Sequence, residues 1–262
     1  MKIGIIGGGN MGGAIAVGLA KSGKFAAGDI IVTDPTPAKL GELASQAPGI
    51  TVSTDNVDAT RGTDIVLLAV KPWLLEQVLT SIAPRIDFRS QIIISIAAGV
   101  TLDTINSWLS AYSSERTIFR AMPNTAIAIR QSMTFLCHSN ASDEQIASVT
   151  DIFSALGKAA VIEERLMCAA TALCSCGIAY AMRYVRAATE GGVQLGFYAS
   201  SGKDYVLQTL RGAIELLEAT DNNPEVEIDK VTTPGGVTIR GLNAMEANGF
   251  TNAVIQGLLQ SV

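Results

Sequence analysis

Apolar and polar positions form alternating blocks along the first 160 residues. Short apolar runs, too short for helices, are followed by stretches in which apolar residues recur at helical spacing. The strand-like runs are residues 3–6, 30–33, 50–53, 64–70, 91–96, 117–122 and 133–137, and the helical stretches after the first turn are 38–46, 73–82, 102–109 and 143–156, the last stopped by Gly157. This alternation predicts a doubly wound parallel α/β sheet, whose ligands lie beyond the carboxyl ends of the strands.

The pattern changes near Glu163, after which strand-like runs vanish. We expect a long buried helix from Leu166 to Leu195, interrupted near Gly191-Gly192, because small and apolar residues are almost continuous there. Further helices are expected at 200–217 and at the end of the chain. Another is expected between them, starting after residues 232–238 and ending near Asn248, where Gly249 stops it. The sequence therefore predicts two domains, a Rossmann-type domain over 1–160 and an all-helical domain over 161–262. The Ala and Leu content of the second indicates a subunit interface.

A glycine-rich turn follows the first strand and opens the first helix. Gly7, Gly9 and Gly12 fit the pattern G-x-G-x-x-G, and Asp34 ends the second strand about twenty residues later. In this pattern the first glycine allows a tight turn, the second admits a pyrophosphate, and the third lets helix and strand pack closely. The carboxylate binds a ribose hydroxyl. The context favours a dinucleotide site over the alternative, a purely structural glycine turn.

Composition narrows the function classes. The net charge of -5 is unclustered, which argues against a nucleic-acid partner. We find no uncharged apolar stretch of the length expected for a membrane span, and the first strand starts at the N-terminus, so we expect a cytoplasmic enzyme with no membrane partner. The four cysteines lack C-x-x-C spacing, and the single histidine, His138, adjoins one of them. We therefore expect no metal site, and reduced, buried cysteines.

Five motifs together resemble the pyrroline-5-carboxylate reductase family over essentially the whole length. They are Ile6-Gly7-Gly8-Gly9-Asn10-Met11-Gly12, Ala69-Val70-Lys71-Pro72, Ser95-Ile96-Ala97-Ala98-Gly99-Val100, Arg120-Ala121-Met122-Pro123-Asn124-Thr125 and Pro234-Gly235-Gly236-Val237-Thr238-Ile239. The first is common to many dehydrogenases, whereas the combination with the last two is specific. The resemblance implies a Rossmann domain that binds NADPH or NADH and a helical domain that interlocks in a homodimer, in many members within a decamer of five dimers.

The resemblance also implies a reaction, hydride transfer from reduced nicotinamide to the imine carbon of 1-pyrroline-5-carboxylate, which gives L-proline. Cofactor contacts are then expected from Ile6, Gly7, Gly8, Gly9, Asn10, Met11, Asn56, Ala69, Val70, Lys71 and Ala97. The substrate carboxylate would meet the amides of Gly235, Gly236, Val237 and Thr238 at a helix start, with Thr233 nearby. Thr238 and Glu164 are the expected catalytic residues, Thr238 through its hydroxyl at the imine nitrogen.

Each of these residues also has a plainer interpretation. Thr233 alone would be a helix N-cap, and Glu164 alone a solvated carboxylate at a helix start. Asp34 should repel a 2'-phosphate, which predicts NADH over NADPH although the family often prefers NADPH.

The chain departs from the family at Cys174-Ser175-Cys176-Gly177-Ile178-Ala179-Tyr180, where members usually have S-G-S-G-P-A-Y. A reductase of another cyclic imine and a non-catalytic NAD(P)-binding regulator therefore remain alternatives. A 3-hydroxyacid dehydrogenase of the 6-phosphogluconate type is disfavoured, because that class needs a lysine on its interdomain helix and none lies between Lys158 and Lys203.

Overall fold

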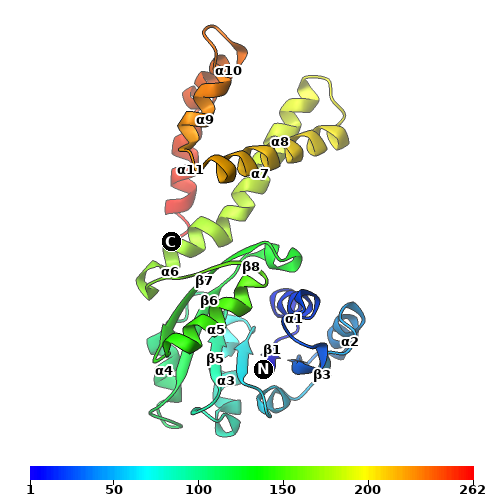
Figure 1. Cartoon of the computed structure of the whole chain (residues 1–262), viewed down its shortest axis with the longest axis vertical. Coiled ribbons are helices and arrows are strands. Elements are labelled where there is room, and N and C mark those ends of the chain that lie inside the picture. Colours follow the sequence, from blue (N-terminus) through cyan, green and yellow to red (C-terminus); the bar gives the residue numbers. More distant parts are fainter. The chain divides into compact units, whose positions relative to one another are not determined.

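The computed structural model describes residues 1–262, which form two compact units, Met1–Ser175 and Cys176–Val262 (Figure 1). The division falls later in the chain than the boundary expected at residue 160. The first unit is the α/β fold predicted from the apolar runs, and the second contains only helices.

One eight-stranded sheet forms the centre of the first unit, in the order β3-β2-β1-β4-β5-β6-β7-β8. Its strands are β1 (Ile3–Ile6), β2 (Ile30–Thr33), β3 (Thr51–Ser53), β4 (Ile65–Leu68), β5 (Ile92–Ser95), β6 (Thr117–Met122), β7 (Ser132–Ser139) and β8 (Gly157–Val161). All neighbours among β1 to β6 are parallel. β7 is antiparallel to β6, and β8 is parallel to β7.

Helices cover both faces of the sheet (Figure 1). Buried side chains on one face come from α1 (Asn10–Ser22), α2 (Pro37–Gln46) and α5 (Asp143–Ser154). Those on the other face come from the 3-10 helix η2 (Asn56–Thr60), α3 (Pro72–Ile82) and α4 (Leu102–Leu109). Short 3-10 turns lie at η1 (Ala27–Asp29), η3 (Ala83–Arg85), η4 (Thr125–Ile129) and η5 (Glu164–Leu166). The unit is thus a three-layer sandwich, as expected for strands buried on both faces.

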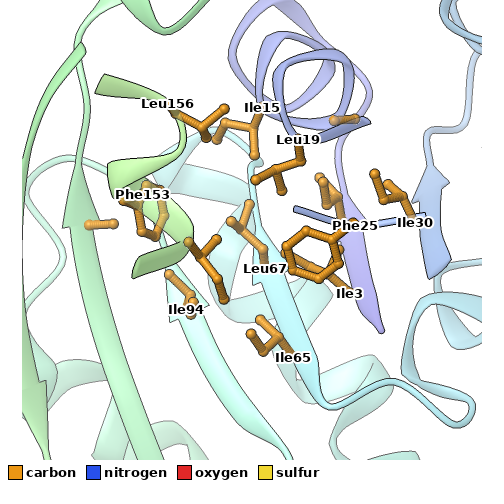
Figure 2. Packing of buried hydrophobic residues seen from close by; sticks show 14 of the residues in the cluster. Ile3, Ile15, Leu19, Phe25, Ile30, Ile65, Leu67, Ile94, Phe153 and Leu156 are labelled. Atoms are coloured by element: carbon orange, nitrogen blue, oxygen red, sulfur yellow. The ribbon is translucent and has the colours of Figure 1, made fainter. Parts of the chain in front are cut away.

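The core under α1 shows why the apolar runs form strands. Figure 2 shows Ile15 and Leu19 of α1 pointing at the sheet, where they meet Ile3 and Leu67, and all four side chains are completely buried. Phe153 of α5 fills the same layer farther along the sheet. Burial of this much branched apolar surface is the main force that holds the layers together.

The strand β8 was not expected. Gly157 was predicted to stop the preceding helix, but α5 already ends at Ser154 and Gly157 begins β8. A side chain there is excluded, because Gly157 has φ 140° and a Cβ would lie 2.1 Å from the carbonyl oxygen of Ser132. The strand sequence G-K-A-A-V carries too little apolar bulk to stand out as a run.

The helical region also differs from the prediction. After α6 (Met167–Ala170) the chain forms a π-helical segment at Thr171–Cys176, and α7 (Gly177–Gln194) then continues through both glycines at which a break was expected. The remaining helices are α8 (Ala199–Thr220), α9 (Pro224–Val231), α10 (Val237–Ala247) and α11 (Phe250–Leu259). The helix α9 was missed, although Asn223 caps it and Pro224 starts it, a common pair of helix-start signals.

The expectation that the long helix is buried was wrong for a single chain. No residue of α7 is buried, and Gly202 is the only buried residue in α7 to α11. Inside the unit, Tyr180 of α7 donates to the carbonyl oxygen of Gly257 at 3.1 Å and also contacts Ser261, so α7 and α11 are tied together. Large apolar side chains such as Leu195, which is 82% exposed, nevertheless face outward.

By length and composition, Glu164–Gln194 is apolar enough to cross a membrane, contrary to the expectation that no stretch would be. This is weak evidence for a membrane span, because the core helix of a soluble protein can pass the same test. The exposed apolar side chains of this segment must be buried against another surface.

The approach of β1 to η2 gives a test of the packing. A Cβ on Gly4 would lie 1.8 Å from the carbonyl oxygen of Ala59, so we expect Gly4→Ala to lower the free energy of unfolding by about 2–3 kcal/mol. Urea unfolding measures the change. Gly41→Ala in α2 is the matched control, because its Cβ meets no atom within 4 Å, and it should stabilise the helix by roughly 0.5–1 kcal/mol. Equal effects of the two variants would contradict the packing argument.

Candidate functional site

The carboxyl ends of the central strands lie level with one another at one edge of the sheet. Pairing aligns the residues in a single row, which consists of Ser53, Thr33, Ile6, Leu68, Ser95 and Arg120. The chain runs from β1 outward to β2 and β3, and then returns to place β4 on the other side of β1. In open α/β sheets such a reversal leaves a crevice for ligands beyond the strand ends, here between β1 and β4.

The three motif glycines at this edge have the expected geometry. Gly7 has φ 109°, which allows the sharp turn out of β1, and a Cβ on Gly12 would lie 1.9 Å from the carbonyl oxygen of Gly7. The helix α1 can therefore start directly behind the strand. A Cβ on Gly9 would meet no atom within 4 Å, so this glycine faces open space. That is the arrangement a pyrophosphate requires at this position.

The backbone amides at the start of α1 are hydrogen-bond donors without a side-chain partner. Gly9 is its N-cap, no side chain caps the helix, and its first turn holds no acidic residue. Amides at a helix start have no partner within the helix, and the helix dipole adds partial positive charge. This end of α1 can therefore hold an anion, as the glycine motif predicts.

Asp34 is fixed in place directly after β2. Its Oδ2 accepts from the amide of Gly8 at 3.1 Å, its Oδ1 accepts from the amide of Thr36 at 2.9 Å, and Lys39 Nζ lies 3.8 Å from Oδ1. The residue is only 6% exposed. The carboxylate thus bridges the glycine turn and the start of α2, and carboxylate oxygens retain lone pairs for further donors.

The other predicted cofactor residues follow strand ends at the same edge. Asn56 begins η2, and its Oδ1 accepts from the hydroxyl of Thr33 at 2.9 Å. The amide of Ala69 donates to the carbonyl oxygen of Ile6 at 2.8 Å, and Lys71, two residues on, is exposed just before α3. Ala97 follows β5 and is buried. The structure therefore brings the predicted cofactor residues to one edge, and it adds Thr33, whose link to Asn56 was not apparent in the sequence.

The predicted carboxylate-binding segment lies in the helical unit. α10 has Gly236 as its N-cap and no side-chain cap, so Thr233 does not cap this helix. Gly235 has φ 71°, a conformation that favours glycine. The amide of Gly236 donates to the carbonyl oxygen of Thr233 at 2.9 Å, so of the four predicted donors this one already has a partner in the chain. Val237 and Thr238 form the first turn, where amides have no helical partner.

Glu164 makes two strong contacts inside the first unit. Its Oε1 lies 2.6 Å from a terminal guanidinium nitrogen of Arg120 and 2.7 Å from the backbone amide nitrogen of Leu102. Arg120 lies in the family motif R-A-M-P-N-T, and no role was expected for its side chain. A signal for such a role was present in the sequence, because an arginine within a mostly apolar strand needs a partner for its charge.

The cysteines are free and differ from the expectation of uniform burial. Cys137 is buried, and desolvation raises the pKa of its thiol to about 11, so it remains protonated at neutral pH. Cys168 is exposed, whereas Cys174 and Cys176 are partly buried within the π-helical segment. The carbonyl oxygen of Cys174 accepts from the side-chain amide of Asn124 at 3.4 Å. The departure from the family pattern thus begins beside a motif asparagine.

Comparison with known proteins covers nearly the whole chain. It is 38% identical to pyrroline-5-carboxylate reductase 2 of Dictyostelium discoideum over 99% of its own length and 90% of the relative's. The chain belongs to the pyrroline-5-carboxylate reductase family. The enzyme of that name from Synechocystis sp. is 36% identical over 98% of this chain and 94% of its own length. Residues 164–262 match the family described as pyrroline-5-carboxylate reductase dimerisation, and residues 2–99 match that described as NADP oxidoreductase, coenzyme F420-dependent.

Solved structures of the family have the same fold. The pyrroline-5-carboxylate reductase from Coxiella burnetii superposes with a TM-score of 0.90 at 29% identity, over 99% of this chain and 95% of that one. The Plasmodium falciparum enzyme, solved with NADP bound, gives 0.88 at 28% identity, over 100% of this chain and 95% of that one. The doubly wound unit and the helical unit are therefore family features.

The open space beside Gly9 yields a second test. We expect Gly9→Val to weaken binding of NADH and NADPH, with Kd raised at least about tenfold, because its side chain fills the space that the pyrophosphate needs. Fluorescence titration measures binding. The fold should be unaffected, since a Cβ at Gly9 touches nothing in the protein. Gly28→Val, in η1 and also free of neighbours, should leave binding unchanged. Unaltered binding by Gly9→Val would remove this turn from the cofactor site.

Proposed function

We propose that this chain is a pyrroline-5-carboxylate reductase, which reduces 1-pyrroline-5-carboxylate to L-proline with NAD(P)H. The full-length relationship to reductases of that name is the observation that carries the proposal. The chemistry needs little from side chains. A nicotinamide cofactor supplies the hydride for the imine carbon, and a cyclic imine is basic enough to arrive with its nitrogen protonated. The chain must hold the two rings in contact and bind one carboxylate.

The proposed cofactor site is the edge beyond β1, β2, β3, β4 and β5. The start of α1 would hold the pyrophosphate, and the residues after the five strands, Asn56 after β3 included, would line the rest of the dinucleotide. The uncapped start of α1 and the open space beside Gly9 support this assignment.

The proposed substrate site is the start of α10. The amides of Val237 and Thr238 would bind the carboxylate, with Gly235, Gly236 and Thr233 shaping the turn around it. The hydroxyl of Thr238 would meet the ring nitrogen. The lack of a side-chain cap and the left-handed Gly235 support this role, because no side chain accepts from the first amides of α10 and the turn before them has a conformation that favours glycine.

A change at Thr238 tests the substrate site. With pyrroline-5-carboxylate and either cofactor, the protein should oxidise the nicotinamide, seen as a loss of its absorbance. Thr238→Ala should lower kcat/KM by about 10- to 100-fold, as expected for a lost hydrogen bond to a charged group, and leave cofactor binding intact. Thr238→Ser keeps the hydroxyl and should retain most activity. No oxidation by the unaltered protein would instead favour a regulator that binds NAD(P) without catalysis.

We propose that the preferred cofactor is NADH. The fixed, buried carboxylate of Asp34 at the end of β2 supports this preference, because a carboxylate accepts from a free 2'-hydroxyl and repels a 2'-phosphate.

Exchange of Asp34 tests the preference. The unaltered protein should use NADH with the higher kcat/KM, and Asp34→Asn should shift the ratio of the two values toward NADPH by about tenfold, or ~1.4 kcal/mol. Asp29→Asn, at the opposite end of β2, is the matched control and should not alter the ratio. A clear preference of the unaltered protein for NADPH would contradict the assignment.

A reductase of another cyclic imine is the second candidate. The change from S-G-S-G-P-A-Y to Cys174-Ser175-Cys176-Gly177-Ile178-Ala179-Tyr180 favours it, because two hydroxyls become thiols and a proline is lost in a segment whose backbone accepts from the motif residue Asn124. Relative kcat/KM values for five- and six-membered ring imines distinguish the two candidates.

We further propose a homodimer built by the helical unit, with the decamer of five dimers as the larger form, and a cytoplasmic location. Two observations support the dimer. Residues 164–262 match a dimerisation family, and α7 to α11 carry many exposed apolar side chains.

A further inference from the structure

A buried ion pair lies at the ligand edge of the sheet. Arg120 of β6 is paired in register with Ser95, the last residue of β5, and is only 5% exposed. Its guanidinium meets Glu164 Oε1 at 2.6 Å, and the carboxylate side chain is 29% exposed. The pair therefore lies at the level where the neighbouring strands end.

The same carboxylate oxygen binds a third segment. Glu164 Oε1 accepts from the amide of Leu102, the first residue of α4, at 2.7 Å. Thr101 independently caps α4 by accepting from the amide of Thr104 at 3.1 Å. Glu164 thus places its charge at a helix start, where the dipole favours an anion. One oxygen joins η5, β6 and α4.

The short connection between β5 and α4 is held at both ends. At its beginning, the amide of Ile96 donates to the carbonyl oxygen of Leu68 at 3.1 Å, and the amide of Ala97 donates to Ser95 Oγ at 3.3 Å. At its end, Leu102 is bound by Glu164. This connection contains Ala97, a proposed cofactor contact, and Gly99, which has φ 77°.

The surroundings of the pair are apolar. Ile118, Met122, Cys137 and Met167 belong to the same buried cluster on this face. Arg120 Nε is buried there without a hydrogen-bond partner. Burying charges is costly, and replacing such pairs by apolar residues is often neutral or stabilising, so stability alone does not account for this one.

We infer that Arg120 and Glu164 are positioning residues, which act on the cofactor by holding the connection between β5 and α4. The inference rests on the proposed cofactor site. Neither side chain needs to touch a reacting atom. This assignment gives Glu164 a positioning role in place of the catalytic role that the family resemblance implied.

A pair of variants separates positioning from packing. Arg120→Met/Glu164→Leu removes both charges together and leaves no unpaired buried charge, so the Tm should fall less than in a variant that removes one charge alone, although the amide of Leu102 loses its partner. Its Kd for NADH, measured by fluorescence titration, should nevertheless rise about tenfold, because the connection is no longer preorganised. The KM for the cofactor should rise in parallel, with a smaller change in kcat.

Glu164→Gln is the second variant. It keeps an oxygen for the amide of Leu102 but leaves Arg120 without an anionic partner, so it should lower the Tm while raising the Kd for NADH less than the double variant does. If the double variant does not fold, the Tm and the Kd of Glu164→Gln still test the inference. A pair with a purely structural role would lower the Tm of this variant and leave its Kd for NADH unchanged. Arg165→Met, in the exposed pair of Arg165 with Glu163, is the matched control and should change neither quantity.

Unaltered cofactor binding in a folded double variant would overturn the inference. Because binding is measured directly, this outcome is distinct from failure of the proposed reaction. Failure of the proposed reaction would appear as a lack of nicotinamide oxidation by the unaltered protein. This result could occur even if the variants changed the Kd for NADH as expected.

Discussion

The first unit depends on one close approach of backbone to backbone. α1 can begin immediately behind β1 only because Gly7 turns with a positive φ and Gly12 brings no Cβ against the carbonyl oxygen of Gly7. Larger residues would push the helix away from the strand and displace Ile15 and Leu19 from the layer that they fill. The same approach sets the bare amides of the helix start next to the carboxyl end of β1. Packing and ligand binding are thus consequences of the same contact.

The protein treats the backbone amides at its helix starts in two ways. The chain's own carboxylates serve some of them, since Asp34 binds the amides of Gly8 and Thr36, and Glu164 binds that of Leu102. The starts of α1, α2 and α3 in the first unit and of α10 in the helical unit receive no cap from the side chain of their N-cap residue. An uncapped start keeps its partial charge available for an external anion, whereas a capped one is electrostatically satisfied.

Much of the fold was predictable because strong local signals determine it. The central strands β1, β4 and β5 are apolar runs that are completely buried, and the glycine turn has a steric cause that can be read in the sequence. β8 escaped prediction because its small residues obtain their place from pairing with β7, and the π-helical segment at Thr171–Cys176 has no clear sequence signal. The pairing of Arg120 with Glu164 could not be foreseen either, because the fold joins residues that are distant in the chain. Likewise, the sequence could not reveal that Gly236 donates its amide to Thr233.

The nearly complete lack of buried residues in α7 to α11 affects how this part of the chain folds. Helices without an interior of their own gain little free energy until apolar surface from elsewhere covers them. In the proposed dimer, that surface comes from a second chain, so folding of the helices and association become a single equilibrium. Dilution would then melt this part of the protein instead of releasing intact monomers, and its apparent stability would depend on protein concentration.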